Sequence, residues 1–182
     1  DLEKGEVCSG SSGDSAAIVR QHYSNDVSIR LVRRSLEIFQ GFTDEFDGAQ
    51  AFTNAGWLFL VPEEASEMFS MNLVRLKGLG VRTWELSLED AIQELPGLNV
   101  DGIARVSFEP DSGYADPHVT ANAMLSKAKQ LGAESHIRTP ATGITRTGGA
   151  VSVVSTPKGD IETEVVVNAA GPWASQVGDW LG

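Results

Sequence analysis

Three side chains near the start of the chain, Arg20, His22 and Tyr23, could contact a small polar substrate. The planar fork of an arginine matches a carboxylate with two parallel hydrogen bonds, which a lysine cannot form. Arg20 ends a run of small and apolar residues, so it is either an ion-paired structural residue or a carboxylate clamp. His22 and Tyr23 could donate hydrogen bonds to a ligand, although a histidine is often structural. We treat the three as candidate catalytic residues, with both interpretations open.

A second group of candidates follows the apolar residues 165–167. Small residues at the carboxyl end of a buried strand let a bulky ligand approach the backbone, and open α/β sheets bind ligands at that edge. A tight strand-to-helix turn would use the same residues without a ligand, because short glycine motifs are weak signals. The residues concerned are Ala169, Ala170, Gly171 and Trp173.

The N-terminal segment holds a third group. If residues 2 and 3 end a strand, Glu3 is placed to accept hydrogen bonds from a ribose diol, whereas an acid near a chain start is commonly just solvated. Residues 10–13 read Gly-Ser-Ser-Gly, the composition of a phosphate-binding loop, because glycine permits close approach of an anion to backbone N–H groups. The segment lacks the lysine of a P-loop, so a flexible surface loop is an equal alternative.

Composition and charge narrow the class of partner. The chain has 182 residues, 41% of them hydrophobic, which suffices for one sizeable core. Its 14 Lys+Arg and 25 Asp+Glu give 14 − 25 = −11, a charge that repels nucleic acid and anionic lipid. No apolar run reaches the roughly 20 residues of a membrane helix. A single cysteine excludes an internal disulfide and indicates a reducing compartment, so we expect a cytoplasmic protein. The histidines show no metal-ligand spacing, and we expect no metal.

Hydrophobic spacing and turn residues predict a mixed order of elements. Four helices are expected, at residues 24–46, 62–80, 87–95 and 116–131. Strands are expected as a hairpin at 52–61, a single strand at 103–108, and a meander of four runs at 134–138, 143–147, 151–156 and 161–168, the last of them buried. The first helix should bury one stripe, formed by Val27, Leu31, Ser35, Phe39, Phe42 and Phe46.

Four segments together resemble the D-amino-acid-oxidase-like superfamily of FAD-dependent oxidoreductases, in particular its sarcosine oxidase, dimethylglycine dehydrogenase and glycine oxidase branches. They are residues 2–5, 10–23, 113–117 and 165–173. The resemblance implies an α/β fold, α+β overall, with FAD as cofactor. Residues 1–40 and 110–182 would form a partial Rossmann-like FAD/NAD(P)-binding domain with a β-meander. Residues 41–109 would be an inserted α+β portion of the substrate-binding domain.

The same resemblance suggests roles for the candidates. Arg20 is similar to an arginine that meets the substrate carboxylate in sarcosine oxidases, and the acid of the second strand holds the adenosine ribose. The loop at 10–23 would pass beside the pyrophosphate and the flavin ring. The implied cofactor contacts are Glu3, Lys4, Ser11, Ser12, Gly13, Ser15, Ala169, Ala170, Gly171 and Trp173.

The implied function is the oxidation of the C–N bond of a small secondary or tertiary amino acid, by hydride transfer to flavin, in a longer parent protein. The family's glycine-rich turn would lie upstream of Asp1. The C-terminal third, which in relatives supplies the rest of the substrate domain and a second flavin-contacting loop, would lie downstream, so we expect the isolated fragment to be inactive. Ala16-Ala17 replaces a charged residue of some sarcosine oxidases, which argues against sarcosine itself. Two alternatives stay open: a glycerol-3-phosphate-dehydrogenase-like flavoprotein with Arg20 facing phosphate, and a non-catalytic module that binds a partner protein through residues 41–109.

Overall fold

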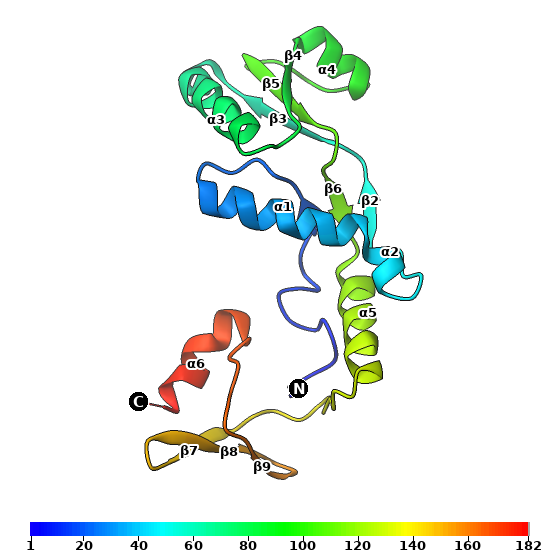
Figure 1. Cartoon of the computed structure of the whole chain (residues 1–182). Helices are drawn as coiled ribbons and strands as arrows, with labels where there is room; N and C mark the ends of the chain where they lie inside the picture. The colour runs from blue at the N-terminus through cyan, green and yellow to red at the C-terminus, as the bar shows by residue number, and fades with distance from the viewer. Residues whose placement is uncertain (182) are drawn as a thin grey trace. The chain divides into compact units, whose positions relative to one another are not determined.

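The computed structural model of the chain describes residues 1–181 and divides them into two compact units (Figure 1). One unit consists of Asp1–Ser15 and of the chain from Pro117 onwards, and the other is Ala16–Asp116. The boundaries therefore fall after residues 15 and 116, whereas the sequence predicts them after 40 and 109. The reason is that the first strand pairs with residues 113–115, which ties residues 16–40 to the second unit. The assignment of one part to the cofactor and the other to substrate stays a prediction.

The second unit contains two antiparallel sheets of three strands each. In the first sheet the strand order is β1-β6-β2, and in the other it is β3-β5-β4. The strands are β1 (Ile18–Val19), β2 (Phe52–Asn54), β3 (Trp57–Val61), β4 (Trp84–Leu86), β5 (Arg105–Glu109) and β6 (Gly113–Ala115).

The predicted hairpin at 52–61 is wrong, because β2 and β3 belong to different sheets and pair with β6 and β5. Gly56 lies between them with φ +73°, a left-handed conformation that glycine adopts without strain. A Cβ at this position would lie 2.6 Å from the ring of Phe108. The residues around Gly56 therefore do form a turn, but this turn carries the chain from one sheet to the other instead of closing a hairpin.

The helices of the second unit lie close to the predicted positions. They are α1 (Asp26–Gln40), α2 (Phe42–Glu45), a 3-10 turn (Glu63–Ala65), α3 (Ser66–Gly78) and α4 (Leu88–Glu94). Asn25 caps α1 by accepting from the N–H of Ser28 at 2.9 Å, and Ser87 caps α4 by accepting from the N–H of Asp90 at 3.0 Å.

Phe42 of the predicted stripe is buried in α2, but the buried face of α1 itself differs from that stripe. Val27 and Leu31 are 68% and 64% exposed, whereas Ile29 and Leu36 are buried. Both sets have helical spacing, so periodicity identifies the helix but does not decide between two apolar faces. Ile29 packs with Leu76 of α3, which places the inner face of α1 against that helix.

Helix α3 is the centre of the apolar core of this unit. Leu76 joins the cluster with Ile29 and Val81, while Phe69 and Leu73 pack against Val61 of β3. Partly buried side chains, Tyr23 and Leu79 in the first cluster and Phe59 and Ala65 in the second, pack against these residues. Burial of side chains such as Leu76 and Phe69 contributes about 1.5–3 kcal/mol each, so α3 couples α1 to the sheet that carries β5.

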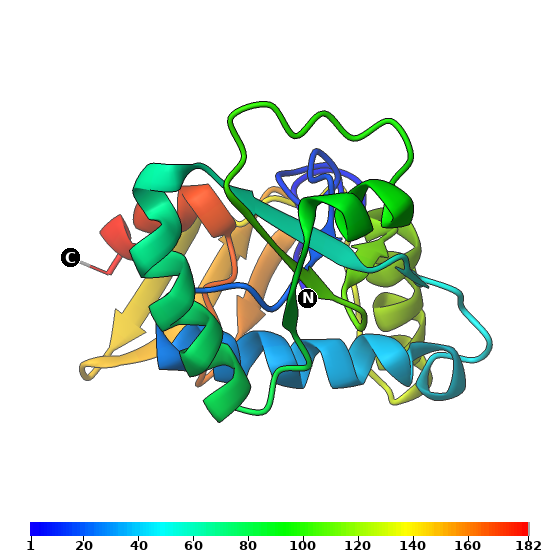
Figure 2. The same cartoon turned by 90° about the horizontal axis from the view of Figure 1, so that it is seen from above.

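The first unit combines the N-terminal segment with the C-terminal elements. Leu2 forms a parallel bridge with His136, and the N–H of Glu3 donates to the carbonyl of His136 at 3.1 Å. Figure 2 shows the strands of the meander side by side, in yellow to orange. The elements are α5 (Pro117–Gln130), β7 (Gly143–Thr147), β8 (Ala150–Thr156), β9 (Gly159–Glu162), a 3-10 turn (Gly171–Trp173) and α6 (Ala174–Asp179).

The prediction of a buried strand over 161–168 is wrong. Strand β9 ends at Glu162, and Val165 and Val167 are 74% and 84% exposed. A run of valines forms a buried strand only beside other strands, and within residues 1–181 no strand pairs with this segment. The predicted strand at 134–138 is reduced to the single bridge of His136. No helix among the described residues has both the length and the apolar character needed to cross a bilayer.

Candidate functional site

Arg20 is half-buried in the second unit and lies between two aromatic rings. Its guanidinium carbon is 4.8 Å from the ring centroid of Tyr23 and 5.8 Å from that of Trp57, both within the range of cation–π attraction. Its Nη1 donates to the backbone carbonyl of His22 at 2.6 Å. Within residues 1–181 no carboxylate forms an ion pair with Arg20. The arginine is therefore positioned by aromatic contacts and a carbonyl, and its charge is not neutralised.

The ring of His22 is 5% exposed and is surrounded by protein groups. It stacks on Phe59 with a centroid distance of 3.8 Å. Its Nε2 lies 3.1 Å from Nδ2 of Asn72, and its Nδ1 lies 3.4 Å from Oε1 of Glu109. The structure thus brings Arg20 and His22 together, but both ring nitrogens of the histidine face protein atoms. Its catalytic role stays a prediction.

Sequence reasoning missed Glu109, the last residue of β5. The residue is fully buried, and its Oε2 accepts from the N–H of Gln21 at 2.9 Å and from Oγ of Ser112 at 2.9 Å. Trp57 is its cross-strand partner, so the carboxylate lies in the same neighbourhood as the ring that flanks Arg20. An acid at the end of a strand of otherwise half-buried or buried residues was the available signal, because ionised side chains are rarely fully buried without partners.

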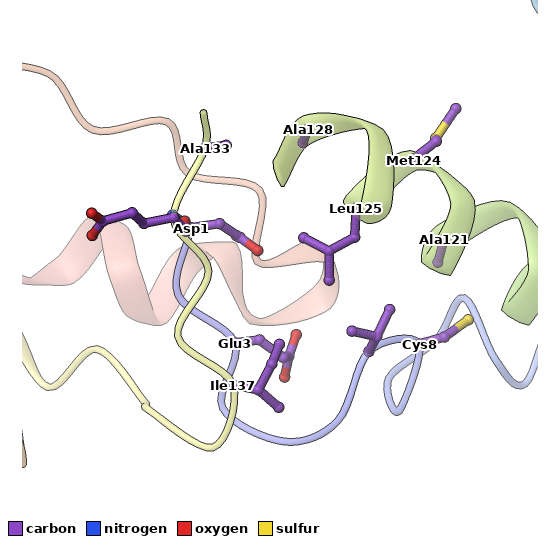
Figure 3. A pocket seen from close by; sticks show the side chains of 11 residues that line it. Asp1, Glu3, Cys8, Ala121, Met124, Leu125, Ala128, Ala133 and Ile137 are labelled. Atoms are coloured by element: carbon purple, nitrogen blue, oxygen red, sulfur yellow. The ribbon is translucent and has the colours of Figure 1, made fainter. Parts of the chain in front are cut away.

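The first unit contains a cavity of about 320 Å³ between the N-terminal segment and α5. Its wall is largely apolar, and Figure 3 shows Leu125 of α5 directed toward the segment that carries Glu3. Oε1 of Glu3 accepts from the N–H of Gly5 at 2.6 Å, while Cys8 lies at another edge of the cavity. Lys4 is exposed and is not part of the wall.

The serine-rich loop and the C-terminal candidates lie near each other in this unit. A Cβ on Gly10 would be 3.8 Å from the ring of Trp173, although more than 160 positions separate them in the chain. Gly13 permits a tighter contact, since a Cβ there would be 2.1 Å from the carbonyl oxygen of Cys8. Ser11 and Ser12 are exposed, and their N–H groups have no hydrogen-bond partner among residues 1–181. Such N–H groups are suited to an anion.

The remaining candidates of the first unit form an exposed turn. The side chain of Asn168 accepts from the N–H of Ala170 at 3.3 Å and donates to the carbonyl of Ala174 at 2.8 Å. Gly171 has φ +56°, and Trp173 is 48% exposed. Ala169 and Ser15 are exposed as well. No group of three or more acidic, histidine or cysteine side chains within the described residues is arranged to hold a metal ion.

The chain belongs to a family described as FAD dependent oxidoreductase, whose model matches residues 2–181. It is 29% identical over 192 residues to mitochondrial sarcosine dehydrogenase of Mus musculus, covering 100% of this chain and 20% of that protein. It is 25% identical over 183 residues to mitochondrial dimethylglycine dehydrogenase of Rattus norvegicus, covering 100% of this chain and 21% of that protein. The chain therefore spans about a fifth of the length of these relatives.

Among solved structures, the L-proline dehydrogenase of P. horikoshii is similar with a TM-score of 0.93 and 30% identity, over 99% of this chain and 48% of that one. The predicted family and the mixed fold are confirmed, and the family depends on FAD as the sequence predicts. The first unit fits part of such a cofactor, because Ser11 and Ser12 offer unpaired N–H groups to a phosphate and Glu3 offers an acceptor to a ribose.

Proposed function

We propose that the protein carrying this chain oxidises the C–N bond of a small secondary or tertiary amino acid, with Arg20 binding the substrate carboxylate. The observation that carries this proposal is the unpaired, half-buried guanidinium of Arg20 between Tyr23 and Trp57. The three relatives support the substrate class, since sarcosine, dimethylglycine and proline all combine a substituted amine with a carboxylate.

Arg20 can bind a carboxylate because its other interactions leave donors available. One Nη1 contact to the carbonyl of His22 fixes the orientation of the guanidinium, and the remaining N–H groups form a fork that fits two carboxylate oxygens. The flanking rings of Tyr23 and Trp57 place apolar surface beside the guanidinium, and a lower local dielectric strengthens the attraction to an anion. A carboxylate held in this way presents the neighbouring C–N bond in one orientation.

FAD, when bound, accepts the hydride that leaves the carbon beside nitrogen. In the first unit, Glu3 would accept from the ribose hydroxyls, and the N–H groups of Ser11 and Ser12 would bind the pyrophosphate. Gly13, Ser15 and Lys4, which are also predicted cofactor contacts, would contact FAD from the same N-terminal segment. A further contact surface would be the exposed turn, whose predicted residues are Ala169, Ala170, Gly171 and Trp173.

Replacement of Arg20 by Gln tests the proposed function. In the FAD-loaded protein we expect KM for an amine substrate with a carboxylate to rise about 100-fold, because hydrogen bonds between charged groups contribute about 1.5–3 kcal/mol. The matched control is Arg34→Gln, since Arg34 is an exposed arginine on α1 that pairs only with Glu37 at 2.9 Å in the described chain. An unchanged KM in Arg20→Gln would show that Arg20 does not bind the substrate carboxylate.

A substrate panel separates the proposal from its rivals. Turnover of secondary and tertiary amino acids supports it, whereas turnover of glycerol 3-phosphate alone would assign Arg20 to a phosphate. A protein that takes up no flavin and binds a partner through residues 41–109 would be a non-catalytic module. A cytoplasmic location also stays a proposal, because two of the relatives are mitochondrial by name.

A further inference from the structure

We propose that Glu109 is a positioning residue of the substrate site: its buried carboxylate holds Gln21 and His22, and through them it orients Arg20. This inference rests on the proposed function of Arg20. Glu109 is fully buried, yet it forms no pair with an arginine or a lysine among the described residues. An ionised carboxylate in such a place destabilises the protein unless hydrogen bonds compensate for its lost hydration.

The compensating groups of Glu109 all lie beside the proposed clamp. Oε2 accepts from the N–H of Gln21 and from Oγ of Ser112, both at 2.9 Å. Oε1 lies 3.4 Å from Nδ1 of His22, and neither of these two atoms has a hydrogen-bond partner among the described residues, so the two polar atoms face each other without a hydrogen bond. Two of the three groups therefore belong to the residues that directly follow Arg20.

The ring of His22 has a defined polarity in this arrangement. Nδ2 of Asn72 can only donate, so Nε2 of His22 accepts and the ring proton of a neutral imidazole lies on Nδ1. Nδ1 lies 3.4 Å from Oε1 of Glu109, on the side of the ring away from Asn72. Asn72 therefore donates to Nε2 of His22, and the proton-bearing Nδ1 lies on the side of the acceptor Glu109. The stack on Phe59 fixes the plane of the ring.

The link to the clamp runs through the backbone of the same segment. The carbonyl of His22 accepts from Nη1 of Arg20 at 2.6 Å. If the ring and the N–H of the segment lose their anchor, this carbonyl is no longer fixed, and the guanidinium loses the contact that sets its direction. Glu109 acts through these neighbours and does not itself touch substrate in the proposal.

The test uses Glu109→Gln, a variant of almost the same shape. The oxygen of the new amide can still accept from Gln21, but its NH₂ group meets the Nδ1 proton of His22, so two donors face each other. In the FAD-loaded protein we expect KM for a carboxylate amine to rise about 10-fold with kcat changed less than about 3-fold, the pattern of lost binding in ground and transition state alike. The matched control is Glu85→Gln on the neighbouring β4, which should leave KM unchanged.

A compensating variant separates positioning from simple destabilisation. In Glu109→Gln with Asn72→Asp the order of donors and acceptors is reversed, since the new NH₂ group at position 109 can donate to Nδ1 of His22 and the new carboxylate at position 72 can accept the proton on Nε2. We expect this double variant to recover most of the lost KM. A double variant as impaired as Glu109→Gln alone would overturn the proposed polarity.

Two readouts do not depend on turnover. Hydrogen exchange at the N–H of Gln21 should accelerate about 5-fold in Glu109→Gln, because a hydrogen bond to a charged acceptor is about twice as strong as a neutral one. ¹⁵N spectra of labelled histidine should show the proton of His22 on Nδ1 in the unaltered protein and on Nε2 in the double variant Glu109→Gln with Asn72→Asp. If the protein oxidises no amine, the proposed function fails while these readouts still test Glu109. If exchange, ring tautomer and KM are all unchanged, the positioning role is overturned.

Discussion

The replacement of Gly13 by Ala tests whether the serine-rich loop binds the cofactor. A Cβ built at this position would lie 2.1 Å from the carbonyl oxygen of Cys8 and 3.3 Å from its carbonyl carbon. Non-bonded carbon and oxygen atoms do not approach this closely, and the obstacle is backbone, so the loop must move. Forcing a methyl group into a well-packed position costs about 1–3 kcal/mol.

The free-energy cost of the methyl group in Gly13→Ala can lower either the affinity for FAD or the stability of the FAD-free protein. If the free loop relaxes, the displacement must be reversed when FAD binds, and the Kd for FAD rises by roughly 5- to 150-fold for about 1–3 kcal/mol. If the free loop cannot relax, the same free energy appears as a lower stability of the protein. Flavin fluorescence titration measures the first part and urea unfolding of the FAD-free protein the second.

Gly10→Ala is the matched control within the same loop. A Cβ on Gly10 would be 3.8 Å from the ring of Trp173, an ordinary contact, so we expect both affinity and stability to change little. The reasoning is refuted if Gly13→Ala binds FAD and unfolds like the unaltered protein. It is refuted equally if Gly10→Ala is as impaired as Gly13→Ala.

Two further predictions concern stability. Leu76→Ala removes a side chain with 0% exposure from the cluster of α1 and α3. It should lower the free energy of unfolding, measured in urea, by about 2–5 kcal/mol. The control Val74→Ala, at a residue that is 72% exposed, should change this free energy by less than about 0.5 kcal/mol. The pKa of Glu85 is lowered by its hydrogen bond from Arg105, so its contribution to stability is present above the unfolded-state pKa and is lost as the pH falls through the lower folded-state pKa. Unfolding measured between about pH 7 and pH 3 should show a shallower loss in Glu85→Gln, and an identical pH dependence would contradict this assignment.

Most of the helices were predicted from residues that start, cap or end a helix through their own backbone or side chain. Pro117 opens α5, Ser87 caps α4, and Gly80 follows the end of α3 with φ +79°. Each of these residues stabilises or ends a helix through its own backbone or side chain, so the neighbouring sequence contains the whole cause. The positions of the helices therefore follow from the sequence without knowledge of the fold.

Features that depend on distant partners were predicted less well. The face that α1 buries is decided by Leu76 on α3, and the pairing of β2 is decided by β6 some sixty positions away. The same holds for the valines at 165 and 167, whose burial would need neighbouring strands. Glu109 was missed for this reason as well, because its importance arises from contact with Gln21, 88 positions earlier.

The separation of Arg20 from Glu109 explains how one unit can hold a buried acid and still attract an anion. A direct ion pair between them would neutralise the guanidinium and leave little attraction for a substrate carboxylate. In the structure the carboxylate accepts from an N–H and a hydroxyl and lies 3.4 Å from an imidazole nitrogen, while the arginine is held by a carbonyl and two aromatic faces. Glu109 can fix the geometry of residues 21 and 22, and through the carbonyl of His22 the orientation of Arg20, while the charge of the guanidinium stays available to a substrate.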